Sequence, residues 1–140
     1  MSGAIRSMIG PAKATLMKCQ TETNAHLTAR PAQMAAAEEW TQWVQLLKND
    51  RLKLESAINR IDVQVQRWTE LMLRLDAAEL NAENVIYEDT AKGEHGFLGA
   101  VETGHELLAN LITSIEIGET ATNPPKAPPN AQPQNNLRQN

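Results

Sequence analysis

Residues 40–75 of the chain read WTQWVQLLKNDRLKLESAINRIDVQVQRWTELMLRL. Within this stretch, one series of positions spaced alternately four and three residues apart is apolar at every member except Arg51. A sustained period of 3.5 residues is typical of a long helix that packs lengthwise against a second helix. At about 1.5 Å per residue, the stretch forms a helix of roughly 50 Å whose apolar stripe needs a partner. The apolar members of the series are Trp40, Val44, Leu47, Leu54, Ile58, Ile61, Val65, Trp68, Met72 and Leu75.

The same spacing returns after residue 80 and predicts the partner helix. A single helix through both series would be longer than ordinary globular helices, so we expect a tight reversal at residues 76–81, capped by Asp76 or Asn81. A straight rod that pairs between two chains would use the same stripe and is the alternative. His105 falls in the second series, whose large aliphatic members are Leu98, Val101, Leu108, Ile112 and Ile115.

Glycines interrupt the second series at several points. Gly93 and Gly96 enclose a local weak point, which we interpret as a kink or short break in the returning helix. Gly99 and Gly104 loosen that helix further or permit the close approach of a neighbour. Gly118 follows the last apolar member and predicts the C-terminal end of the helix.

The predicted fold class is therefore all-α. It is a long antiparallel helical hairpin resembling a coiled coil, with helices at about 32–76 and 80–117. A shorter amphipathic helix is expected from near Pro11 to about residues 24–26, because proline is tolerated in the first turn of a helix but not deep inside it.

Three regions follow from this organisation. Residues 1–30 hold the N-terminal amphipathic helix and its connector, and residues 31–118 hold the hairpin. Residues 119–140 contain five of the seven prolines, with many Asn and Gln residues. Such a segment buries too little apolar surface to offset its ordering entropy, so we expect a disordered tail.

Composition and charge exclude several classes of function. The net charge is −4, with 17 acidic residues against 13 Lys and Arg, so no overall field attracts nucleic acid. Cys19 is the only cysteine, which excludes an internal disulfide or a Cys-rich zinc site and favours a reducing compartment. No stretch approaches the roughly 18 apolar residues that a membrane span requires. We therefore expect a cytoplasmic protein. The alternative is a mitochondrial transit peptide or surface-binding helix in residues 1–20, which lack acidic residues.

Several individual residues have both a functional and a structural interpretation. Arg51 either fixes the register of the seam or packs its stem while its guanidinium reaches an acid on the returning helix. Trp43 lies off the seam and is a candidate for a contact patch or for packing against the N-terminal helix. The three histidines, His26, His95 and His105, are too scattered for a metal site.

No catalytic constellation is apparent. Cys19 has no convincing His partner and is interpreted as a small apolar contact. Asp89-Thr90-Ala91 is a triplet known from aspartic proteases, but it lies in a helical pattern. The minimal PxxP at residues 125–128 is interpreted as part of a solvated linker. We therefore expect no catalytic residue, no cofactor and no metal.

Four stretches of the chain read AEEW at 37–40, LKNDRLKLESAINRID at 47–62, ENVIY at 83–87 and GFL at 96–98. With the opening residues and the proline-rich end, they resemble the N-terminal helical region of gag-type polyproteins of BEL/Pao LTR retrotransposons. In that family this region precedes capsid-like, zinc-knuckle, protease and reverse-transcriptase parts, whose motifs do not occur in this sequence. The resemblance implies a stand-alone piece of such an element.

The expected function is that of a non-enzymatic self-association or scaffold segment. Its working surface would be formed by apolar seam residues that the hairpin leaves uncovered. The alternatives are a coiled-coil adaptor that binds a helix of a host protein, or a small helical protein targeted to mitochondria. In the first two cases the partner is a protein, either a second copy or another helix, and nucleic acid is not bound by this segment alone.

Overall fold

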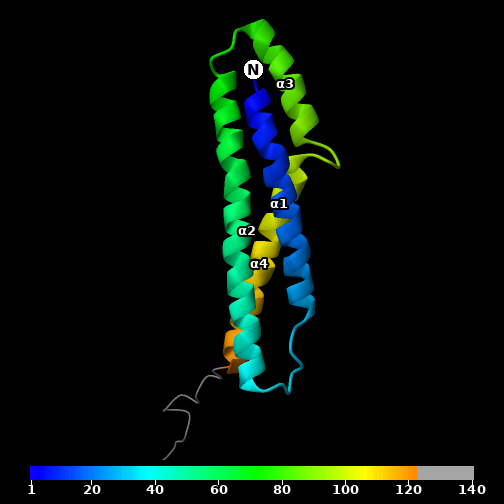
Figure 1. Cartoon of the computed structure of the whole chain (residues 1–140), viewed down its shortest axis with the longest axis vertical. Coiled ribbons are helices and arrows are strands. Elements are labelled where there is room, and N and C mark those ends of the chain that lie inside the picture. The colour runs from blue at the N-terminus through cyan, green and yellow to red at the C-terminus, as the bar shows by residue number, and fades with distance from the viewer. Residues whose placement is uncertain (123–140) are drawn as a thin grey trace, which may run out of the picture.

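A computed structural model describes residues 1–122 of the chain, and every regular element in that range is an α-helix (Figure 1). The helices are α1 (Gly3–Thr28), α2 (Ala37–Met72), α3 (Ala77–Ala91) and α4 (Phe97–Thr122). The predicted all-α class is confirmed. Residues 119–122 of the predicted tail continue α4, and the remainder of that tail, with its PxxP, lies outside the described residues.

Three helices lie side by side along the long axis of the molecule (Figure 1). α2 runs antiparallel to both α1 and α4, and each pair of these three helices is in contact. α3 follows the reversal after α2 and lies at the end of the bundle where α1 begins. The predicted hairpin is therefore present, with α3 and α4 as its returning arm.

The N-terminal helix is shorter than α2, as the sequence predicted, but it is longer than expected and is a full third member of the bundle. α1 and α4 both contain 26 residues. Gln20 of α1 donates from Nε2 to the carbonyl oxygen of Ala100 in α4 at 2.6 Å. The hairpin is thus completed into a three-helix bundle by α1.

α1 begins at Gly3, so the prediction that it starts near Pro11 is wrong. Pro11 lacks the N–H that would bond to the carbonyl of Ser7, and such a loss costs about 3 kcal/mol in a helix interior. The turns before Pro11 persist because they are attached to the bundle, since both Ser2 and Ile9 are buried. Pro11 itself is exposed, so its ring does not disturb this packing.

The reversal after α2 occurs where the sequence predicted it. α2 stops at Met72, a turn earlier than expected, and Asp76 caps α3. The Asp76 Oδ1 accepts from the N–H of Glu79 at 2.8 Å, and the Glu79 carboxylate accepts from the N–H of Asp76 at 3.3 Å. This reciprocal pair forms a capping box. The chain therefore turns back on itself, and the straight rod is excluded.

Two glycines make the break between α3 and α4. Gly93 has a φ of +88°, a conformation that side-chain-bearing residues rarely adopt. A Cβ on Gly96 would overlap the carbonyl group of Ala91. The predicted short break is confirmed, and both positions need glycine for the chain to turn from one helix into the next.

The sequence predicted the buried face of α4 only in part: Val101 and Leu108 pack against the core, as expected of seam residues. Leu98 and Ile112, predicted in the seam, are each 41% exposed, and His105 is exposed as well. Ile115 is buried as predicted. The residues of α4 that are buried are Phe97, Gly104, Leu107, Leu111, Ile115 and Gly118.

Close helix packing at two glycines explains the difference. A Cβ on Gly104 would lie 2.9 Å from Cδ1 of Ile58, and a Cβ on Gly118 would overlap Cγ2 of Val44. α4 therefore approaches α2 through positions without a side chain, which a series of large apolar residues cannot reveal. The predicted helix end at Gly118 is wrong as well, because this glycine is buried and α4 continues to Thr122.

Candidate functional site

The predicted seam of α2 is the core of the bundle. Val65, Met72 and Leu75, toward the end of the series, are half-buried. The other apolar members are no more than 7% exposed, so they stabilise the bundle and offer no surface to a partner. These buried members are Trp40, Val44, Leu47, Leu54, Ile58, Ile61 and Trp68.

Exposed residues on α4 form a regular stripe of their own. Leu98 and Ile112 lie near its two ends, about 21 Å apart along the helix. Val101 and Leu108, which the sequence also placed in the seam, are half-buried along one edge. The stripe carries two glutamates and no Lys or Arg. Its members follow the spacing 4-3-4-3-4 and are all exposed, and we name them the α4 stripe: Leu98, Glu102, His105, Ala109, Ile112 and Glu116.

A groove runs between α1 and α2. Its wider part has a volume of about 450 Å³ and lies between Cys19 of α1 and Leu52 of α2. A narrower part of about 160 Å³ lies between Met8 of α1 and Val63 of α2. Arg60 lines both parts, so they adjoin. We name this surface the α1–α2 groove, formed by Met8, Thr15, Cys19, Leu52, Lys53, Ser56, Asn59, Arg60 and Val63.

The charged residues of the α1–α2 groove are Lys53 and Arg60, and no acidic side chain lines either part. Met8 and Leu52 are more than half exposed, at 53% and 66%, and Val63 is also exposed. The groove therefore has apolar residues at both ends and positive charge between them. Sequence reasoning did not find it, because its two walls are far apart in the chain.

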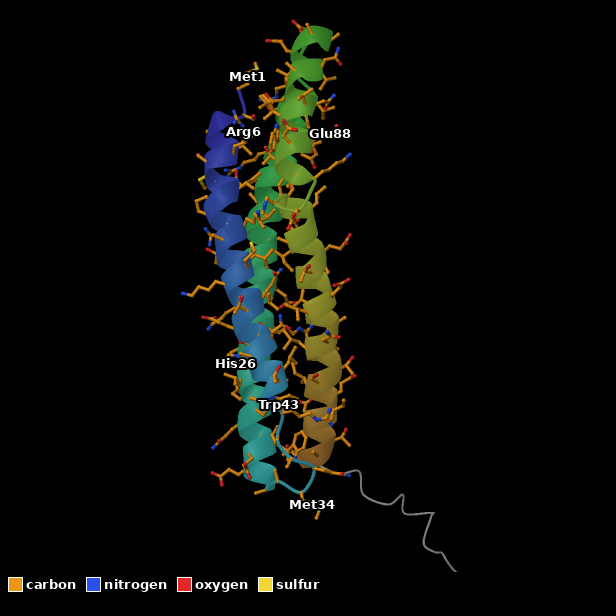
Figure 2. All side chains as sticks on the ribbon, turned by 90° about the vertical axis from the view of Figure 1, so that its right-hand side faces the viewer. Met1, Arg6, His26, Met34, Trp43 and Glu88 are labelled. Atoms are coloured by element: carbon orange, nitrogen blue, oxygen red, sulfur yellow. The ribbon has the colours of Figure 1, made fainter. Side chains whose placement is uncertain are left out.

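A polar pair joins the C-terminal part of α1 to α2. The Nδ1 of His26 donates to Oδ2 of Asp50 at 2.6 Å, and the Asp50 side chain is 4% exposed. The indole Nε1 of Trp43 donates to the backbone carbonyl of His26 at 2.8 Å. The predicted packing of Trp43 against the N-terminal helix is confirmed. Figure 2 shows His26 and Trp43 close to each other in the lower part of the bundle.

Sequence reasoning missed Asp50 and misjudged its neighbour. Asp50 lies three residues after Leu47 and four before Leu54, so it fits the helical spacing as well as Arg51 does. The structure places Asp50 in the interior. Arg51 is half-buried, and its Nε lies 3.6 Å from Oε2 of Glu55 on the same helix. The predicted contact of Arg51 with an acid on the returning helix is therefore wrong.

Glu83 connects α3 to the rest of the bundle. Its Oε2 accepts from Nε1 of Trp68 at 2.9 Å, and the residue is 5% exposed. Burial raises the pKa of the Glu83 carboxyl. Hydrogen bonds from Ser2 and Trp68 lower the pKa, and so do the positive charges of the N-terminal amine and Arg6. The lowering effects are larger, so the pKa lies below its ordinary value. The ionised carboxylate therefore attaches α3 to Trp68 of α2 and to Ser2 at the start of α1. Figure 2 shows Met1 and Arg6 at the end of the bundle where α3 lies.

The structure places each residue that the sequence singled out for possible metal binding or catalysis. Within residues 1–122, no group of three or more His, Cys, Asp or Glu side chains could hold a metal ion. Cys19 is half-buried and packs against the core, as expected for a small apolar contact. Asp89 and Thr90 lie within α3, where the Thr90 hydroxyl donates to the carbonyl of Ile86.

Among residues 1–122, no helix combines the length and the apolar character that crossing a bilayer requires.

Comparison with known proteins adds no relative. Protein families, curated proteins and solved structures yield no match to this chain. The resemblance to BEL/Pao gag proteins therefore depends on the quoted sequence stretches alone. The fold defines the chain as an all-α protein with a three-helix bundle and two exposed surfaces of unlike charge.

Proposed function

We propose that the chain is a non-enzymatic helical segment that associates with copies of itself and acts as a scaffold, like the N-terminal region of a BEL/Pao gag protein. The observation that carries this proposal is the α4 stripe. Leu98 and Ile112 remain exposed on a folded bundle at the spacing of helix-packing residues. Aliphatic side chains at that spacing gain free energy when another helix covers them.

The expected affinity of one such contact is low. Leu98 and Ile112, the large aliphatic side chains of the α4 stripe, are already more than half covered within the bundle. Covering the rest contributes about 1 kcal/mol per side chain. A single pair of copies therefore dissociates readily, and stable assembly needs contacts repeated along many copies. This behaviour suits a scaffold segment.

The mitochondrial alternative is less favoured by the packing of α1. Ile9, Ala12 and Leu16 form the apolar face of residues 1–20, and all three are buried in the bundle. A cleavable leader would remove this face and expose core residues of α2 and α4. The cytoplasmic location remains a prediction from the sequence.

An adaptor would use the α4 stripe in the same way, with a helix of another protein in place of a second copy. Sedimentation equilibrium of the purified chain from about 1 µM to about 1 mM separates the two functions, because this range covers weak and moderate dissociation constants. The proposal expects a mass that rises with concentration. A constant monomer mass over the whole range would contradict self-association.

A double variant locates the surface responsible. Leu98→Gln with Ile112→Gln removes the two large exposed aliphatic side chains of the α4 stripe and is expected to keep the chain monomeric. The matched control is Leu73→Gln with Val85→Gln, since these residues are 81% and 61% exposed and lie outside α4. The control is expected to associate like the wild type. Equal association of both variants would contradict the role of the stripe.

A further inference from the structure

We propose that the α4 stripe of one copy docks in the α1–α2 groove of a second copy, so that the chains assemble head to tail. This inference rests on the proposed self-association and adds which two surfaces meet. Its occupant is a second copy of this chain, and charge complementarity between the two surfaces supports it.

The two surfaces carry opposite charges. Lys53 and Arg60 are the charged residues of the groove, and both are exposed. Glu102 and Glu116 are the exposed carboxylates of the stripe. Glu102 and Glu116 are 14 positions apart, about 21 Å along α4, whereas Lys53 and Arg60 are 7 positions apart, about 10 Å along α2, so a docked stripe places one glutamate beside a basic side chain. Opposite charges at an interface steer association and fix the register of the partners.

The apolar residues of the two surfaces are separated by distances that differ by about one helical turn. Leu52 and Val63 are 11 positions apart, about 16 Å along α2, and Arg60 lies between them. Leu98 and Ile112 are about 21 Å apart along α4, and Glu102 lies between them. Each surface thus has two apolar positions with charge between them, positive in the groove and negative at Glu102 of the stripe.

Symmetric pairing is disfavoured by the same charges. Two stripes packed in parallel would bring Glu102 and Glu116 against their own copies, and two grooves would do the same for Lys53 and Arg60. Two stripes packed antiparallel would instead set Glu102 against Ile112 and Glu116 against Leu98, which places carboxylates on aliphatic side chains. Like charges placed opposite each other at an interface are unfavourable. Pairing of unlike surfaces is free of this penalty.

A single copy cannot join its own stripe and groove. α4 faces α1 through Gly99, Ala100 and Thr103, which line a pocket shared with Lys13 and Gln20. None of these α4 residues belongs to the stripe, which lies on another side of the helix. The contact must therefore form between copies, and such a head-to-tail contact generates rings or open chains of molecules.

Charge reversal on each surface tests the pairing. The groove variant is Lys53→Glu with Arg60→Glu, and the stripe variant is Glu102→Lys with Glu116→Lys. All four side chains are exposed, so folding is expected to be retained and is checked by circular dichroism. Each variant alone is expected to raise the dissociation constant more than about tenfold. An equimolar mixture restores association, because the lysine stripe then meets the glutamate groove, and the unchanged stripe of the groove variant meets the unchanged groove of the stripe variant.

The control is Glu70→Lys with Arg74→Glu, two exposed charges outside both surfaces, and it should associate like the wild type. Head-to-tail docking is wrong if the groove variant associates as well as the wild type. It is also wrong if the mixture of the two variants stays monomeric. In both cases self-association of the wild type stands. If the wild type is monomeric at all concentrations, the proposed function itself is wrong.

Discussion

Gly118 of α4 lies against the side chain of Val44 in α2 so closely that a Cβ at position 118 would overlap the Val44 Cγ2 methyl group. The ring of Trp43 also lies within contact distance of that position. The long helices of the bundle therefore approach each other through a residue that has no side chain to pack.

The variant Gly118→Ala is expected to destabilise the bundle by about 1–3 kcal/mol, because the added methyl forces α4 away from α2. Gly99→Ala is the matched control in the same helix. A Cβ at Gly99 meets nothing within 4 Å, so the better helix propensity of alanine is expected to stabilise the chain by about 0.5–1 kcal/mol. Urea unfolding measures both effects, and a destabilisation of equal size at the two positions would contradict the packing described.

A second prediction concerns the pair of His26 and Asp50. Asp50→Ala leaves the half-buried imidazole of His26 without its acceptor, and the expected loss of stability is about 1–3 kcal/mol. Asp62→Ala on the same helix is the control, because Asp62 is exposed and is expected to change stability by less than about 0.5 kcal/mol. Thermal unfolding followed by circular dichroism measures the difference. Similar losses for both variants would mean that the pair does not stabilise the contact between α1 and α2.

A third prediction concerns Glu83, whose lowered pKa makes the free energy of unfolding depend on pH in the acidic range. Its pKa in the folded chain lies below the ordinary value of 4.5, so the ionised carboxylate stabilises the fold above that pH. This contribution is lost as the pH falls through the lowered pKa. Glu83→Gln removes the titrating group, and its unfolding free energy is expected to fall less than that of the wild type between about pH 6 and about pH 3.

The measurement for Glu83 is urea unfolding of both proteins at a series of pH values. The other carboxylates titrate in both proteins, so the difference between the two curves isolates Glu83. Two parallel curves would show that the carboxylate is no better stabilised in the folded chain than in the unfolded one.

A fourth prediction concerns Gln64, which is 6% exposed. Its Oε1 is buried and accepts no hydrogen bond from the described residues. Burying an amide oxygen without a donor is unfavourable, so Gln64→Met, which keeps the volume, is expected to stabilise the chain by about 1 kcal/mol. Gln66→Met is the exposed control and should change little. A clear destabilisation by Gln64→Met would indicate that the amide makes a bond that stabilises the fold.

The features predicted correctly from the sequence are those with local causes. The buried series of α2 follows from the spacing of large apolar residues, the reversal at Asp76 from capping chemistry, and the break at Gly93 and Gly96 from backbone conformation. The start of α1 was missed because Ser2 and Ile9 hold it through contacts with distant parts of the chain. Part of the buried face of α4 was missed because Gly104 and Gly118 carry no apolar side chain.

The candidate surfaces were predictable only in part. Leu98 and Ile112 were selected from the sequence as members of a covered seam, and the structure leaves them exposed. The α1–α2 groove could not be predicted, because residues 8–19 and 52–63 form it only after α1 and α2 pack side by side.

The tryptophans lie at the two ends of the long central helix. The rings of Trp40 and Trp43 are 5.7 Å apart at one end, and Trp68 contacts Tyr87 at 5.0 Å at the other. About 38 Å of helix separates Trp43 from Trp68. Variants that keep a single indole therefore carry a fluorescent probe confined to one end of the molecule. Their emission can reveal which end opens first when the protein is heated.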